Sequence, residues 1–244
     1  MKSEWMTAGC FMLNVEQFRY DADNLSYVIY GSKQAVIIDG GAWREILLFL
    51  DNNSLSPEIV TNTHGHYDHT SGNDELRKLT KARFWDFAAS AGDREILLEG
   101  EKISVWRTPG HTADSVCFYT GRFLITGDTL FNGTIGNCFS GDLKSFYLTI
   151  KRLMSLPDNT VVYAGHDYVK DSLAFAKRLE PDNRNIDEFG KFYDSGHVCS
   201  TMADERRVNP YLRFNEESII RLLQKTGLPC ATEWERWQSL MLLE

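Results

Sequence analysis

The run Thr63-His64-Gly65-His66-Tyr67-Asp68-His69 is the most informative stretch of this chain. It places three histidines and one aspartate within seven residues, and histidine is the commonest metal ligand in proteins. Two of the three remaining histidines lie in short glycine-containing motifs, His111 in residues 108–112 and His166 in residues 164–168. Asp128 lies between these two motifs. This concentration of ligand types indicates metal chemistry before any fold is assigned.

Each of these candidates follows a stretch that is typical of a β-strand. Residues 58–63 and 160–163 are short and rich in β-branched side chains, and residues 102–108 alternate apolar and polar side chains. Residues 115–119 and 122–126 are predicted to form a hairpin. Ligand sites in α/β folds favour the loops beyond strand ends. Four strand ends that carry histidines and aspartates therefore predict one assembled site.

The rest of the chain is predicted to combine strands with amphipathic helices. A hairpin is expected from residues 25–30 and 34–38. Helices are expected in six segments, residues 43–50, 74–79, 143–156, 168–179, 216–224 and 232–242. No strong strand is expected after residue 163, so the chain is predicted to be an α/β protein with a helical tail. Trp234 and Trp237 share one face of the last helix, where core packing is expected.

The composition excludes several classes of function. The chain has 244 residues, 43% of them hydrophobic, and a net charge of -8. Nucleic acid is not an expected partner, because phosphate contacts need clustered positive charge. No apolar run is long enough to span a membrane, and the polar residues 1–5 do not begin a signal peptide. Five scattered cysteines suit a reduced compartment, so a cytoplasmic location is expected.

The candidate ligands are numerous enough for two metal ions. Zinc binds imidazole and carboxylate ligands, and iron or manganese accept the same types. Two ions about 3.5–4 Å apart can share a water and act on one substrate. A polar loop without metal is the competing interpretation, but the long motif and its distant partners argue against it. The predicted ligands are His64, His66, Asp68, His69, His111, Asp128 and His166.

The motif of residues 63–69 resembles the signature of the metallo-β-lactamase superfamily. Other motifs of that superfamily match in order at Asp39-Gly40, residues 108–111, Gly127-Asp128 and Gly165-His166. Within the superfamily, the chain resembles glyoxalase II, the hydroxyacylglutathione hydrolases. The more specific matches extend over nearly the whole chain, at residues 127–131, 165–168, 180–183 and 209–213.

The resemblance implies an αββα sandwich as the catalytic domain, residues 1–166, and a helical substrate-binding lobe, residues 167–244. It implies one ion held by His64, His66 and His111 and a second held by Asp68, His69 and His166, with Asp128 as the bridge. Asp68 and Asp128 would be the catalytic residues, because they would orient a metal-bound hydroxide for attack on an acyl carbon. Asp39 is expected to orient a ligand.

The expected substrate is a small thioester derived from glutathione. Tyr168 matches a tyrosine that contacts glutathione in glyoxalase II. That family also has a basic residue and an aromatic residue after a Gly-x-Gly motif, where this chain has Asn137 and Phe139. A basic cluster is typical of the family's C-terminal helix, whereas residues 233–238 hold Arg236 as their only cation. The other nearby cations, Arg213, Arg221 and Lys225, are expected, like Arg236, to be solvated surface charges.

Three alternatives remain open at this point. The chain could be a persulfide dioxygenase with one iron held by His64, His111 and Asp128, a hydrolase of another ester or lactone, or a non-catalytic binding module. The sequence offers no dedicated general acid. A thioester substrate is compatible with the lack of a general acid, because a thiol with a pKa of about 8.5 leaves readily as thiolate.

Overall fold

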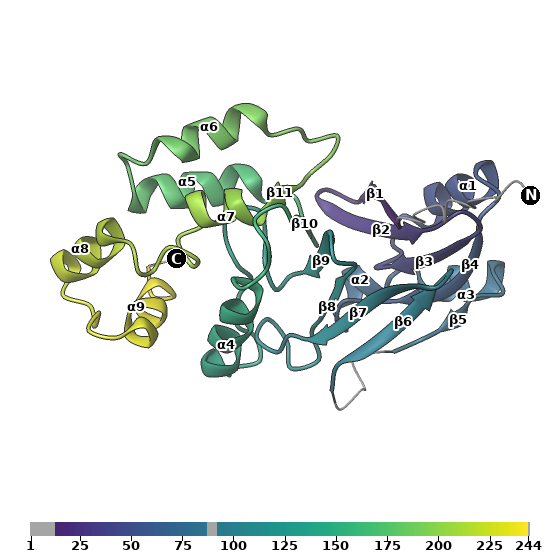
Figure 1. The fold of residues 1–244 in the computed structure, drawn as a ribbon, viewed down its shortest axis with the longest axis horizontal. Coiled ribbons are helices and arrows are strands. Elements are labelled where there is room, and N and C mark those ends of the chain that lie inside the picture. The colour runs from purple at the N-terminus through teal and green to yellow at the C-terminus, as the bar shows by residue number, and fades with distance from the viewer. Residues whose placement is uncertain (1–12, 87–91, 244) are drawn as a thin grey trace, which may run out of the picture.

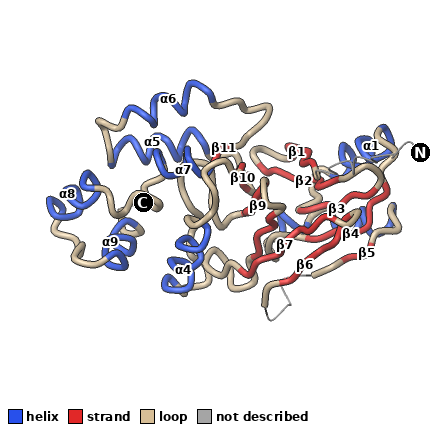
Figure 2. Tube along the Cα trace, viewed as in Figure 1, coloured by secondary structure: helices blue, strands red, loops and turns tan. Residues whose placement is uncertain are grey.

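The computed structural model describes residues 13–86 and 92–243. Residues 1–5, which were not expected to begin a signal peptide, and Cys10 lie outside the described residues. Two sheets lie side by side, with helices at both ends of the molecule (Figures 1 and 2). The strands of the first sheet are β1 (Asn14–Tyr20), β2 (Asn24–Tyr30), β3 (Gln34–Ile38), β4 (Ser56–Thr61) and β5 (Arg83–Phe84). Those of the second are β6 (Arg94–Leu98), β7 (Glu101–Arg107), β8 (Val116–Tyr119), β9 (Phe123–Gly127), β10 (Val161–Ala164) and β11 (Ser200–Thr201).

The helices divide between the two ends of the molecule. The first three lie against the first sheet, and the others lie beyond the second sheet (Figure 1). The first group is α1 (Trp43–Asn52), α2 (Tyr67–Thr70) and α3 (Asn73–Leu79). The second group is α4 (Leu143–Leu153), α5 (Val169–Leu179), α6 (Arg184–Phe192), α7 (Met202–Val208), α8 (Glu217–Thr226) and α9 (Glu233–Leu240).

The two sheets have mixed strand directions. In the first sheet the order is β1-β2-β3-β4-β5, and β3 pairs with β4 in parallel. In the second the order is β11-β10-β9-β8-β7-β6, and β9 pairs with β10 in parallel. Since β7 and β9 are each antiparallel to β8, β7 runs in the same direction as β9. The carboxyl ends of β7, β9 and β10 therefore meet at one edge of the second sheet.

Successive side chains along each strand point to opposite faces of the sheet, and this alternation produces the layers of the sandwich. Tyr27 and Ile29 belong to the core between the two sheets, where they meet Phe118 and Ile125 of the second sheet. Val28, one position away, packs with α1 and α3 on the outer face of the first sheet. The same period of two occurs in the second sheet, so both sheets are covered on both faces. The fold is an αββα sandwich, which confirms the predicted class.

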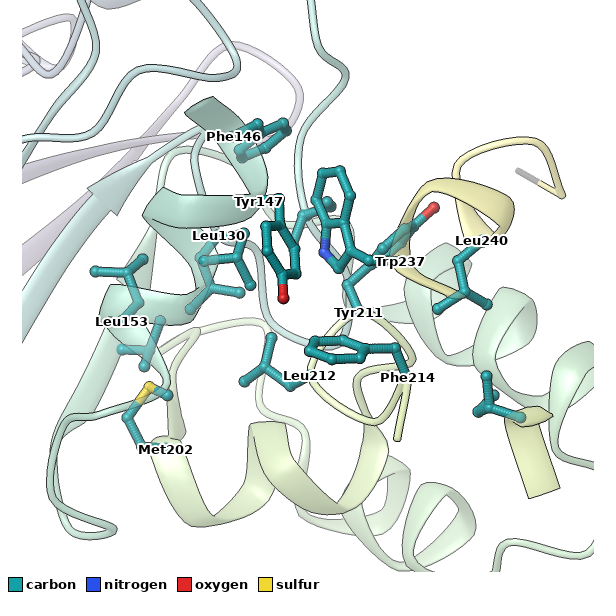
Figure 3. Close-up of a cluster of buried hydrophobic side chains, with 14 of the residues drawn as sticks. Leu130, Phe146, Tyr147, Leu153, Met202, Tyr211, Leu212, Phe214, Trp237 and Leu240 are labelled. Atoms are coloured by element: carbon teal, nitrogen blue, oxygen red, sulfur yellow. The ribbon is translucent and has the colours of Figure 1, made fainter. Parts of the chain in front are cut away.

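Four of the C-terminal helices, α5, α7, α8 and α9, share one core with α4 and the outer face of the second sheet. Trp237 of α9 is fully buried and packs against Phe146 and Tyr147 of α4, with ring centroids 5.8 and 5.7 Å apart (Figure 3). Tyr211 and Phe214 close the same cluster from the segment before α8. The prediction that Trp237 packs in the core is confirmed. The helical tail is thus fastened to the sandwich by a continuous apolar contact.

Most predicted elements are present, with shifted ends and several omissions. Both predicted hairpins form antiparallel pairs, β2 with β3 and β8 with β9. The expected helix at residues 143–156 ends earlier, at Leu153. Seven elements were not predicted by the sequence patterns, namely β1, α2, β5, β6, α6, β11 and α7. The two-residue strand β11 pairs with β10, so the tail contributes one short strand to the sheet.

Candidate metal centre

All seven predicted ligands converge at one edge of the sandwich. Three groups of donor atoms each lie within 4.8 Å of one another. One group contains His64, His66 and His111, another contains His64, His69 and Asp128, and a third contains Asp68, His69 and His166. The residues come from the loops after β4, β7, β9 and β10, as the strand-end argument predicted.

Asp128 lies between the two histidine groups. Its Oδ2 is 3.5 Å from Nε2 of His111 and 3.4 Å from Nε2 of His166, and its Oδ1 is 3.3 Å from Nε2 of His69. In the third group, Oδ2 of Asp68 is 3.3 Å from Nε2 of His166. Asp128 therefore has the position of a bridging carboxylate between two adjoining sites.

The outer nitrogens of the histidine rings are held by the protein. Nδ1 of His166 is 2.8 Å from Oδ1 of Asp23, and Nδ1 of His111 is 2.9 Å from the carbonyl oxygen of Asn137. Nδ1 of His69 is 3.0 Å from Oδ2 of Asp39. Because these oxygens accept hydrogen bonds, each Nδ1 carries a proton, which leaves each Nε2 free to offer a lone pair to a metal ion.

Asp39 fixes the orientation of two histidines at once. Its Oδ2 accepts hydrogen bonds from Nδ1 of His69 and, at 2.7 Å, from the hydroxyl of Thr63. The Thr63 hydroxyl in turn lies 3.1 Å from Nδ1 of His64, so it accepts the His64 proton. The backbone N–H of Thr63 donates to Oδ1 of Asp39 at 2.7 Å. Asp39 contacts ligands from outside the donor groups, as expected for a residue that orients them.

The chemistry of the donor set fits a pair of divalent ions. Nε2 of His64 is 2.9 Å from Nδ1 of His66, and Nε2 of His69 is 3.2 Å from Nε2 of His166. Where both nitrogens carry lone pairs at these distances, a proton or a metal ion must lie between them. A tetrahedral zinc ion with bonds of about 2.0–2.1 Å would hold neighbouring nitrogens roughly 3.3 Å apart. Oδ1 of Asp128 is buried without a hydrogen-bond donor among the described residues, and a metal would satisfy it.

Burial and charge also prepare the ligands for metal. Burial lowers the pKa of His64 to about 4, so its imidazole is neutral at pH 7. Burial alone would raise the pKa of Asp128, but the neighbouring His166 and His69 hold it well below its usual value. Burial alone would likewise lower the pKa of His69, yet the Asp39 and Asp128 carboxylates hold it well above its usual value. Such a negative potential favours a cation at the centre.

The sequence patterns missed two residues that support the ligands. Asp23 contacts His166, and Asn24 donates from Nδ2 to Oδ2 of Asp68 at 3.1 Å. Both lie at the turn between β1 and β2, and β1 was not predicted. Asn24 also pairs with His166 in an isolated β-bridge. Only the pairing of the two segments reveals this support, because more than 140 residues separate Asp23 from His166.

The predicted substrate contacts divide into two places. Tyr168 stacks on the ring of His166, with centroids 4.9 Å apart, and it lines a neighbouring pocket together with Asn137. Phe139 does not line that pocket. Its exposed ring lies 5.2 Å from His111 and 5.8 Å from His66, on the side of the other histidine group. His197, the sixth histidine, lies outside the centre and contacts the hydroxyl of Tyr163 at 3.4 Å.

Three cations of the tail, Arg213, Arg221 and Arg236, have partners within the chain. The prediction of solvated charge is wrong for Arg213, whose side chain is 14% exposed and pairs with the buried Glu180 at 2.7 Å. The sequence could not show this, because the two residues are 33 positions apart. Arg221 is exposed and pairs with Glu217 on its own helix. Arg236 donates to Oδ1 of Asn215 at 2.6 Å and to the carbonyl of Cys230 at 3.1 Å.

The sandwich fold and the metal centre are features of one class of proteins, and sequence comparison finds the same class. The sequence model of the metallo-β-lactamase superfamily matches residues 20–85 and 90–166, and that of the hydroxyacylglutathione hydrolase C-terminus matches residues 167–240. The chain is 35% identical to the hydroxyacylglutathione hydrolase of Chromohalobacter salexigens, over 80% of this chain and 84% of that protein. It is 32% identical to that of Psychromonas ingrahamii, over 87% and 91%.

A solved structure shows the same arrangement of the backbone. The crystal structure of ETHE1 from Myxococcus xanthus is similar with a TM-score of 0.63 and 26% identity, over 88% of this chain and 92% of that one. The chain therefore belongs to the metallo-β-lactamase superfamily and, within it, to the hydroxyacylglutathione hydrolase family.

Proposed function

We propose that this protein is a dinuclear metal-dependent hydrolase of a hydroxyacylglutathione or a closely related glutathione thioester. The observation that carries the proposal is the pair of adjoining donor groups with Asp128 between them. The curated relatives that bear the name hydroxyacylglutathione hydrolase support the substrate class. Zinc is the proposed metal, because the donor set is imidazole and carboxylate, and iron or manganese would suit the same ligands.

His64, His66 and His111 would hold one ion, and Asp68, His69 and His166 the other, with Asp128 shared. When bound, such a pair of ions activates water as a nucleophile and stabilises negative charge on an acyl oxygen. Asp68 is 42% exposed at its side chain, so it faces the substrate side of the centre. Its carboxylate is steered by Asn24, and we assign Asp68 and Asp128 the role of orienting the attacking water.

Tyr168, Asn137 and Phe139 are the proposed substrate contacts. Tyr168 and Asn137 line the pocket that adjoins His166, where they would meet the thiol part of the substrate. Phe139 lies over the other histidine group and would meet the acyl part. We further propose that residues 167–244 act as a substrate-binding lobe on a catalytic domain of residues 1–166, since α5 begins directly after His166.

A reducing compartment such as the cytoplasm is the proposed location. Cys117, Cys138, Cys199 and Cys230 are all free among the described residues, and unpaired cysteines are typical of reducing surroundings. None of the helices in the described part of the chain has the length and apolar character needed to cross a membrane.

The proposal is tested by metal content and hydrolysis measured on the same samples. The purified holoenzyme should contain two ions per chain and hydrolyse S-lactoylglutathione. His69→Ala should lose one ion and at least about 100-fold in kcat/KM, because His69 belongs to two donor groups. His197→Ala is the matched control, since His197 is exposed and lies outside the centre.

Two results would overturn the proposal. Full activity of His69→Ala with a single ion would exclude a dinuclear mechanism. One iron per chain, together with oxygen uptake on glutathione persulfide, would assign a dioxygenase instead.

A further inference from the structure

One buried carboxylate lies outside the metal centre and has no part in the proposed reaction. Glu205 of α7 is fully buried, and no cation lies within ion-pair distance of it in the described part of the chain. Its carboxylate instead accepts hydrogen bonds from the hydroxyl of Ser200 at 2.6 Å, from Nδ2 of Asn209 at 2.8 Å and from the backbone N–H of Gly133 at 3.1 Å. A buried charge is costly unless donors surround it, so an ionised Glu205 needs these three groups in place.

One of these donors belongs to the loop that carries part of the metal centre. The loop between β9 and α4 contains a small hairpin, residues 130–135, which is closed by an antiparallel bridge between its first and last residues. Glu205 holds the tip of this hairpin at Gly133. Asn209 holds it one residue further on, because its Nδ2 also donates to the carbonyl of Thr134 at 3.0 Å. The tail therefore fixes the hairpin at two neighbouring points.

The base of the hairpin packs directly on two of the predicted metal ligands. Asp128 precedes the hairpin by two positions. Gly136 follows it, and a Cβ there would lie 2.0 Å from the carbonyl oxygen of Asp128 and 3.0 Å from Nδ1 of His111. The next residue, Asn137, accepts the hydrogen bond from His111. Since not even a Cβ fits between these groups, a movement of the hairpin would displace Asp128 and turn the ring of His111.

The carboxyl group of Glu205 exchanges its proton near neutral pH. Burial, together with the neighbouring Asp204 carboxylate, raises the pKa of Glu205 from 4.5 to about 7, although the three hydrogen bonds oppose this rise. The hairpin itself carries no ionisable side chain. Other ionisable side chains beside this network, none of them hydrogen-bonded to Glu205 in the described chain, are Cys199 next to β11, Glu188 on α6, and Arg206 and Arg207 on α7.

The charge on Glu205 decides how firmly the hairpin is held. Charge-assisted hydrogen bonds are roughly twice as strong as neutral ones, so the ionised form holds the N–H of Gly133 tightly. A protonated carboxyl group must donate its hydrogen, and the oxygen of Ser200 is in place to accept it. Ser200 would then turn its own hydrogen toward Asn132, whose Oδ1 is buried without a donor among the described residues. That requires the amide of Asn132 to rotate and release the carbonyl of Val162, which it now contacts at 3.2 Å.

We propose that Glu205 is a positioning residue for the metal centre. Its ionised carboxylate holds the hairpin, and through it Asp128 and His111, in the geometry that binds metal. This inference rests on the proposed function, since it assumes that the centre holds metal ions. If metal binds better when Glu205 is ionised, then by linkage the metal affinity rises with pH until this carboxyl group is fully ionised.

The affinity for zinc at two pH values tests the proposal by competition with a chelator. Glu205→Gln has the shape of the neutral carboxyl group, so it should bind zinc about tenfold more weakly than the wild type at pH 8 but less than about threefold more weakly at pH 6. Protonation of the histidine ligands affects both proteins alike and cancels in this ratio. Glu217→Gln is the matched control, because Glu217 is exposed on α8 and loses the same charge. Equal affinities at pH 8, or the same ratio at both pH values, would overturn the proposal.

A second measurement does not depend on how well the variant folds. The carbon-13 NMR signal of the Glu205 carboxyl group is followed through a pH titration of the wild type, with and without zinc. Coupling is reciprocal, so a tenfold effect on zinc affinity requires the zinc-loaded protein to ionise Glu205 about one pH unit lower than the metal-free protein. Identical titration midpoints would show that Glu205 and the centre are uncoupled, and the proposal would be wrong.

Hydrolysis of S-lactoylglutathione separates failure of this proposal from failure of the proposed function. If the wild type hydrolyses it with two ions per chain but Glu205→Gln binds zinc like the wild type at pH 8, the positioning role is wrong and the function stands. If zinc affinity and the ionisation of Glu205 are coupled but no glutathione thioester is hydrolysed, the function is wrong and the positioning role stands. If the wild type binds no metal, both are wrong.

Discussion

Replacement of Asp39 by Asn should weaken metal binding without unfolding the chain. Asp39 has a positive φ of 53°, a conformation that Asn tolerates well, so the backbone should not change. The carboxylate accepts three hydrogen bonds, from the N–H and hydroxyl of Thr63 and from Nδ1 of His69. An amide has one oxygen and one NH2 group, so it cannot accept all three.

The expected loss of metal affinity depends on which ring nitrogen of His69 carries the proton. If the amide NH2 faces His69, Nδ1 must become the acceptor and the proton moves to Nε2, which removes the lone pair from the metal. If the amide oxygen faces His69, the NH2 group meets the N–H of Thr63, and a buried donor is left unpaired. Loss of such an orienting partner typically lowers metal affinity about 10- to 100-fold, or about 1.4–2.7 kcal/mol.

Competition with a chelator on the purified variant measures this loss of metal affinity. We expect at least one of the two ions to bind about 10- to 100-fold more weakly in Asp39→Asn, with an unchanged far-UV circular dichroism spectrum. Asp51→Asn is the control, because Asp51 lies exposed on α1 and makes the same change in charge. Two ions bound with wild-type affinity in Asp39→Asn would refute the assignment of the histidine protons.

Three further changes test other parts of the structure. Burial raises the pKa of Glu205 from 4.5 to about 7, so its contribution to stability is complete below pH 4.5 and is lost as the pH rises through 7. Relative to Glu205→Gln, the wild type should lose about 3 kcal/mol of unfolding free energy between pH 4.5 and pH 8 in denaturant titrations, and parallel curves would refute this. A Cβ at residue 165 would lie 2.1 Å from Oδ1 of Asp128, so Gly165→Ala should reduce metal content and activity at least about tenfold, whereas Gly190→Ala, with no contact below 3.4 Å, should not. Trp237→Ala should lower the unfolding free energy by about 3–5 kcal/mol while metal content stays at two ions per chain, and a loss below 1 kcal/mol in urea titration would contradict the proposed packing of the tail.

The parts of the site that the sequence could predict are local in the chain. His64, His66 and His69 lie in one motif, and the more distant ligands each follow a recognisable strand. Strand ends in an α/β fold meet at an edge, so convergence followed from the order of the elements. The strand and helix patterns predicted an α/β protein with a helical tail, and the αββα sandwich was implied by the resemblance of the motifs to the metallo-β-lactamase superfamily.

The parts that could not be predicted depend on pairing between distant segments. Asp23 supports His166 only because β1 and β2 bring their turn to the metal centre, and β1 is too exposed to show a clear apolar pattern. Arg213 is half-buried and forms an ion pair because Glu180, at the end of α5, lies opposite it.

The origin of the ligands has a consequence for the lifetime of the protein. The loop after β4 belongs to the first sheet, and the loops after β7, β9 and β10 belong to the second, so bound ions join the two sheets across the edge of the sandwich. Each ion binds the folded chain in preference to the unfolded one, and free metal at 1,000 times its Kd adds about 4 kcal/mol to the folded state. A cell that runs short of metal would therefore hold less of this protein, because the metal-free chain unfolds and is degraded more often. Metal supply would set the amount of enzyme as well as the fraction that is active.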